Sequence, residues 1–146
     1  MARGGKERER WTMETRAGRL IEARVFALRT REDADAYSAA LATHVARVPS
    51  QLRPVLCADH RPVVIYPQPA ADRLVELFVA MNTRLERVAI LAARSNATLV
   101  LQLERLVREA AYASRKVVYA KEDAEAHLAP VLGPVELGRL RDFLKG

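Results

Sequence analysis

Apolar and polar residues along this chain alternate with two periods, one typical of strands and one typical of helices. Residues 11–16 alternate between apolar or small side chains and polar ones, which is the period of a half-buried strand. Residues 20–28 repeat that alternation, and the intervening Ala17-Gly18-Arg19 is typical of a hairpin turn. The chain therefore begins its regular structure near Trp11 with a predicted β-hairpin.

Three longer segments carry apolar residues spaced three or four apart, the spacing of one helix face. The first begins at Thr30, which Asp33 follows at the spacing of a capping interaction, and it ends before Pro49. The second has Pro69 near its first turn and an apolar stripe that runs to Leu85. Ser95 or Asn96 caps the third, which reaches residue 110.

Short apolar strands are predicted between and after these helices, at residues 55–58, 88–92 and 116–119. Two further helices follow, a short one over 122–128 and a final one over 134–144. Strands joined through helices imply parallel neighbours and right-handed crossovers. The order predicts a single α/β domain with a mostly parallel sheet, an N-terminal β-hairpin, flanking helices and an extra C-terminal helix.

We expect three parts along the chain: a flexible tail over 1–10, the α/β domain over 11–130 and a helical extension over 131–146. The hydrophobic share of 50% and the charged share of 29% are typical of a soluble globular protein. No apolar run approaches the roughly 20 residues that span a bilayer. The charged N-terminus lacks the apolar core of a secretory signal. These features predict a cytoplasmic protein without membrane insertion.

The net charge of +6 does not by itself indicate a nucleic-acid partner. The basic residues are interspersed with 18 acids, and aromatic residues do not lie between them as in a nucleic-acid footprint. Cys57 is the single cysteine, which excludes an internal disulfide and a cysteine-based zinc cluster. Three scattered histidines and the absence of a Gly-rich phosphate loop predict no metal and no cofactor.

Asp59 and His60 form the best local candidate for catalysis. They follow a buried strand, and in parallel α/β sheets sites lie beyond the carboxyl ends of strands. An aspartate can orient a histidine that acts as a base. Adjacent side chains on an extended strand, however, point to opposite faces. The pair is more typical of a polar strand end or an interaction loop than of a catalytic site.

The segment from Pro62 to Pro69 joins that strand to the next helix and contains the apolar run 63–66. Its prolines do not fit a central strand, so a loop or a short edge segment is predicted. The run either packs beneath the following helix or forms an apolar contact patch, or an edge to which a strand can add.

Several stretches carry a resemblance to a known family: RPVLCADHRPV, ADRLVELFVAMNTRLERVAILAA, SNATLVLQLERLVREA and SRKVVYAKEDAEAHL. Over residues 14–130 the chain resembles the STAS fold, in its SpoIIAA-like branch, which is also similar to lipid-binding Sec14-type domains. The resemblance implies regulatory protein binding in bacterial signal transduction. It also implies a phosphorylated serine at the start of the helix after a central strand. Here no Ser or Thr lies in residues 60–72, so that switch is missing.

The leading hypothesis is a noncatalytic regulatory module that binds another protein through the loop over 59–69 and the helix over 70–85. Its anchors would be Asp59, His60, Val64, Tyr66 and Arg73. Self-association into a homodimer through the same face is a subsidiary hypothesis. Two alternatives stay open. One is a small-ligand or lipid-binding domain, which needs a cavity of roughly 300 Å³ or more. The other is an enzyme that uses Asp59 and His60.

Overall fold

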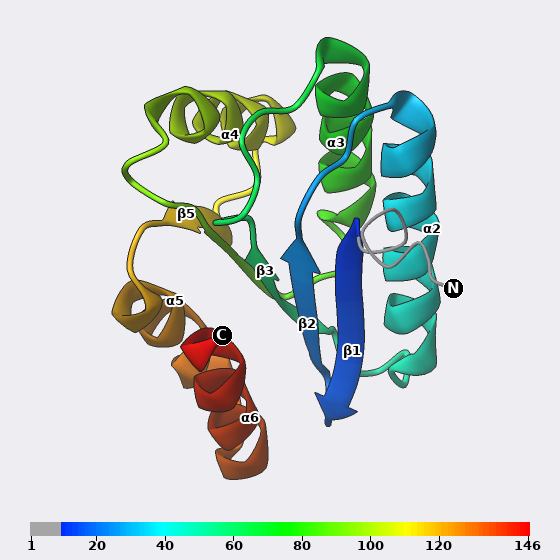
Figure 1. Cartoon of the computed structure of the whole chain (residues 1–146). Helices are drawn as coiled ribbons and strands as arrows, with labels where there is room; N and C mark the ends of the chain where they lie inside the picture. Colours follow the sequence, from blue (N-terminus) through cyan, green and yellow to red (C-terminus); the bar gives the residue numbers. More distant parts are fainter. Residues whose placement is uncertain (1–9) are drawn as a thin grey trace, which may run out of the picture.

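Strands and helices alternate in the predicted order over residues 10–146, the part of the chain that this computed structural model describes (Figure 1). The strands are β1 (Trp11–Ala17), β2 (Leu20–Val25), β3 (Val55–Asp59), β4 (Arg87–Leu91) and β5 (Arg115–Val118). The helices are α2 (Arg31–Arg47), α3 (Gln68–Met81), α4 (Ala97–Ala110), α5 (Lys121–Leu128) and α6 (Pro134–Lys145), with the short 3-10 helix η1 (Ala129–Val131) before α6.

The five strands form one mixed sheet in the order β1-β2-β3-β4-β5. β1 and β2 are antiparallel, and Gly18 in the turn between them has a φ of +52°, a conformation that glycine adopts without strain. All other neighbours are parallel. The fold class is therefore confirmed, a single α/β domain with a mostly parallel sheet and an N-terminal hairpin.

Both faces of the sheet are buried, which divides the apolar residues into two cores. Because β2 to β5 follow one another without a reversal of order, the right-handed crossovers place α2, α3 and α4 on one face. Ile21, Leu56 and Ile90 pack there. On the other face, α5 and α6 cover Leu20, Cys57 and Leu91. Figure 1 shows α5 and α6 on the side of the sheet away from α2 and α3.

The predicted helix starts are confirmed in detail. The side chain of Thr30 accepts a hydrogen bond from the backbone N–H of Asp33, and Asn96 caps α4 in the same way at Leu99. Pro69 lies in the first turn of α3, where its missing N–H removes no helical bond.

The second strand differs from its prediction in length and environment. β2 ends at Val25 instead of residue 28, and the backbone N–H groups of the next two residues both donate to the carbonyl of Arg10. The alternation in this strand predicts one polar, open face, yet Glu22 is only 3% exposed. The reason is α6, whose Arg139 lies over Glu22 and donates two hydrogen bonds of 2.9 and 2.7 Å to its carboxylate.

The C-terminal helix belongs to the core, although residues 131–146 are predicted as an extension. Leu140, Phe143 and Leu144 of α6 are buried in the second core. Of the predicted tail, residues 1–9 lie outside the described residues. Arg10 lies at a turn just before β1 and forms an ion pair with Asp33.

Breaking the Arg139–Glu22 pair tests how firmly α6 is held. We expect Arg139→Ala to lower the free energy of unfolding by about 3 kcal/mol, because it leaves a buried carboxylate without its partner. Urea denaturation followed by circular dichroism measures the change. The control is Arg141→Ala on the same helix, which removes an exposed pair with Glu125 and should leave the midpoint nearly unchanged. Equal midpoints for the two variants would contradict this account.

Candidate interaction surface

The Asp59 carboxylate is an internal anchor at the carboxyl end of β3. It is 1% exposed and accepts four hydrogen bonds. Arg24 donates from Nε at 2.9 Å, while Arg61 donates from its backbone N–H, Nε and Nη2 at 3.0, 2.9 and 3.0 Å. Burial acts to raise the pKa of Asp59, but the hydrogen bonds from Arg61 and Arg24 hold it below its ordinary value. The acceptor positions of an ionised carboxylate are thus already used within the fold.

His60 lies on the opposite face of the sheet and is 1% exposed. Its backbone N–H donates to the carbonyl of Leu91, which continues the β3–β4 ladder. Its Nδ1 is 2.6 Å from the hydroxyl oxygen of Tyr66. Burial lowers the pKa of His60 to about 4 and raises that of Tyr66 well above 10.0. At pH 7 the contact therefore joins a neutral imidazole and a neutral phenol.

Asp59 and His60 consequently do not form the oriented pair that a catalytic histidine needs. Among the described residues, Asp59 is bonded to arginines on the α6 side, and His60 to Tyr66 on the side of α2, α3 and α4. The extended backbone imposes this separation, because consecutive side chains of a strand point to opposite faces. In addition, β2 to β5 follow one another without a reversal of order, and it is at a reversal that such sheets open a crevice.

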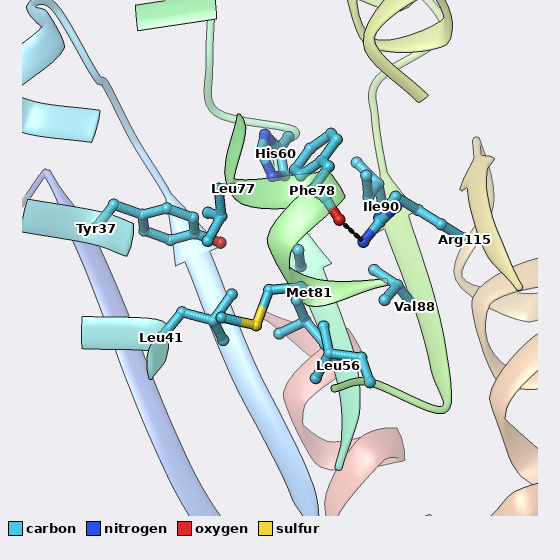
Figure 2. Close-up of a pocket in the computed structure, with 12 residues that line it drawn as sticks. Tyr37, Leu41, Leu56, His60, Leu77, Phe78, Met81, Val88, Ile90 and Arg115 are labelled. Carbon is cyan, nitrogen blue, oxygen red and sulfur yellow. Dashed lines mark hydrogen bonds between the residues drawn. The ribbon is translucent and has the colours of Figure 1, made fainter. Parts of the chain in front are cut away.

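The core beside His60 contains one small enclosed space, shown in Figure 2. Its volume is about 10 Å³, enough for about one water molecule. Tyr37 and Leu41 border it from α2, and Phe78 and Met81 from α3. Arg115 borders it too, and its Nη2 donates to the carbonyl of Phe78 at 2.9 Å. This space is far smaller than the roughly 300 Å³ of a pocket for a small molecule.

The loop between β3 and α3 separates its apolar residues into two buried and two exposed ones. Val63 and Tyr66 are 2% and 1% exposed and pack in the first core. Val64 and Ile65 are 74% and 53% exposed. Half of this run is therefore buried in the first core and the other half is exposed to solvent.

Two side chains of the α4 region hold this loop by its backbone. The Asn96 amide donates to the carbonyls of Val63 and Val64 at 3.0 and 2.8 Å. The Gln102 amide accepts from the backbone N–H of Tyr66 at 2.9 Å and donates to its carbonyl at 2.7 Å. Gln102 thus pairs with Tyr66 as a neighbouring strand would. The loop is fixed on α4 although it contains no regular structure.

A mainly apolar surface with basic neighbours results. We call the exposed side chains Val64 and Ile65 the loop surface; on α4, which holds the loop, Leu101 directly precedes Gln102 and is 67% exposed. Arg61 is partly exposed at the start of the loop and Arg94 is exposed just before α4, and neither residues 60–69 nor residues 92–103 include an acidic residue. Arg94 also stacks on the ring of Tyr119, 4.5 Å from its centroid.

The structure does not bring all the predicted anchors together. Val64 is at the surface, whereas Asp59, His60 and Tyr66 are internal supports of the loop. Arg73 links α3 to α2, with its Nε 2.5 Å from Asp35 and its Nη2 2.9 Å from Ser38. Sequence reasoning missed Gln102, whose only signal is a polar residue beside the buried stripe of α4.

No model of a known protein family matches the chain, and no curated protein matches it. The similarity to the STAS family therefore stays a prediction. Within residues 10–146, no helix has the length and apolarity needed to cross a membrane. The same residues contain no cluster of three His, Cys, Asp or Glu side chains suited to a metal ion. Cys57 is buried, and its burial raises the thiol pKa to about 12.

The buried imidazole predicts a pH dependence of stability. Because the pKa of His60 is lowered from 6.5 to about 4, the unfolded chain binds a proton that the folded chain does not over this interval. Stability is fully present above pH 6.5 and falls as the pH drops toward 4, by about 3 kcal/mol from this residue.

Chemical denaturation at pH 7, 6, 5 and 4.5 measures this loss. We expect His60→Asn to be less stable at pH 7 but to lose much less stability on acidification. His44→Asn is the matched control, because it removes a less buried histidine with a lowered pKa and should retain most of the loss. Identical pH slopes for the wild type and His60→Asn would show that His60 is not the group that titrates.

Proposed function

We propose that this chain is a noncatalytic regulatory module that binds another protein through the loop surface. The observation that carries the proposal is the exposure of Val64 and Ile65 on a loop whose backbone is hydrogen-bonded to α4. Two adjacent apolar side chains held out into solvent are typical of a contact site when they form part of a larger patch. Leu101, one residue before Gln102 on α4, is a further exposed apolar side chain.

The fixed backbone favours binding. A flexible loop loses conformational entropy when it binds a partner, and this loss weakens the complex. Here Asn96 and Gln102 already order the loop at both its middle and its end. Most of the conformational entropy of the loop is therefore lost during folding and not when the partner binds.

The charges around the loop surface indicate the chemistry of the partner. The Arg61 guanidinium is already paired with Asp59, whereas Arg94 makes no ion pair within residues 10–146 and stacks on Tyr119, so the best partner presents an apolar side chain with a carboxylate for Arg94. Apolar contact would supply most of the affinity, and the charges would set the orientation. Binding should weaken moderately as salt is raised.

The regulatory part of the proposal rests on the resemblance to STAS domains. With no Ser or Thr in residues 60–72, control by phosphorylation at the position usual for that family has no acceptor here. The two alternatives receive less support. The space beside His60, of about 10 Å³, is too small for a ligand, and a catalytic Asp59–His60 pair is divided between the two faces of the sheet.

The test compares Val64→Asp with Val135→Asp, since Val135 on α6 is 76% exposed and Val64 is 74% exposed. Each tagged protein is used to isolate partners from native lysate. A partner identified by mass spectrometry is then purified and titrated by calorimetry. We expect the wild type and Val135→Asp to bind with the same affinity, and Val64→Asp to bind at least about tenfold more weakly. A complex that Val64→Asp and Ile65→Asp leave intact would overturn the proposal.

A further inference from the structure

A groove lies at the other end of the sheet from the loop surface. It has a volume of about 420 Å³ and is formed by the end of α2, the α2–β3 connection and the α3–β4 turn. These segments adjoin the amino ends of β3 and β4, the lower end of the sheet in Figure 1. Three arginines line the groove, Arg47, Arg53 and Arg84, and none of its lining residues is Asp or Glu.

Arg53 is held in place by bonds that use only one of its nitrogens. Its Nη2 donates to the carbonyls of Asn82 and Leu85 at 3.2 and 2.6 Å and to the Tyr112 hydroxyl at 2.9 Å. Its Nε and Nη1 have no acceptor among the described residues. The guanidinium is thus positioned by the fold while two of its nitrogens remain able to donate.

The guanidinium groups of Arg47 and Arg84 make no hydrogen bond or ion pair within residues 10–146, although the backbone N–H of Arg84 donates to the carbonyl of Met81. The nearest acid in the chain, Glu86, is paired with Arg19. Arg47 lies in the last turn of α2, where a cation is favourable at the helix C-terminus. That effect accounts for one cation and not for three around a single groove, where like charges repel one another.

We propose that this groove binds a soluble small molecule that carries a phosphate group. Guanidinium groups match phosphate oxygens with paired N–H donors, and three of them compensate the charge of a phosphate dianion. The hydroxyl residues Ser50 and Thr83 also line the groove. Its volume is that of a site for a small molecule.

The apolar residues of the groove indicate which chemical group the ligand carries besides its phosphate. Val45, Val48 and Leu52 contribute apolar surface, as do Pro49 and Pro54. Leu52 is 48% exposed on the groove side of its loop. An apolar group attached to the phosphate would cover these side chains, so phosphate esters with a ring or an alkyl group should bind more tightly than inorganic phosphate.

This site is independent of the proposed function, because its residues and those of the loop surface lie at opposite ends of the parallel strands. The test is a titration of the ¹⁵N-labelled full chain with phenyl phosphate and with inorganic phosphate, followed by amide chemical shifts. We expect saturable shifts at Arg53, Thr83 and Arg84, with tighter binding of phenyl phosphate. Arg47→Gln/Arg84→Gln should weaken phenyl phosphate binding by at least about tenfold.

Arg16→Gln/Arg108→Gln is the matched control, since it removes the same charge from two exposed positions outside the groove. It should keep the wild-type affinity within about twofold. Equal weakening in both double variants, or no saturable shift in the wild type, would overturn the proposal.

Sedimentation with phosphatidylcholine vesicles that contain phosphatidic acid separates soluble from membrane-bound phosphate. Binding to these vesicles without binding to phenyl phosphate would contradict a soluble ligand. Val64→Asp should bind phenyl phosphate as the wild type does, so that failure of the loop surface and failure of the groove are distinguished.

Discussion

Arg24 holds together the parts of this protein that meet at the carboxyl end of its sheet. From β2, its Nε bonds to Asp59 on β3, and its Nη2 donates to the carbonyl of Phe143 on α6 at 2.8 Å. Its guanidinium also stacks on the Phe143 ring, 4.3 Å from the centroid. Asp59 in turn fixes Arg61 at the start of the loop. One partly buried cation thus joins two strands, the last helix and the loop that carries the proposed contact surface.

The order of the elements could be predicted because each depends on local signals. Apolar periodicity, the caps at Thr30 and Asn96 and the position of Pro69 are all readable within a few residues. The burial of Glu22 could not be predicted in this way. It depends on Arg139, which lies 117 residues further along the chain, and alternation alone assigns a polar residue to solvent. The packing of α5 and α6 on the second face of the sheet depends on contacts between distant segments, so it cannot be predicted from a local sequence pattern.

The candidate surface was predictable as a segment but not residue by residue. The sequence places an apolar run between two prolines, and both burial and exposure were open for it. Which side chains face outward depends on Gln102 and Asn96, which fix the backbone from another helix region. The roles of His60 and Tyr66 depend on their contact with each other, and a six-residue separation in a loop gives no regular geometry from which to predict it.

Asn96 and Gln102 bond only to backbone atoms of the loop. The side chains at positions 64 and 65 therefore contribute little to the shape of the loop. Selection could therefore alter these two side chains, and with them the choice of partner, without reworking the scaffold. Positions 96 and 102 have no such latitude, since a hydrocarbon at either would leave backbone groups of the loop without partners. Proteins that share this loop arrangement would vary at positions 64 and 65 and keep the same residues at positions 96 and 102.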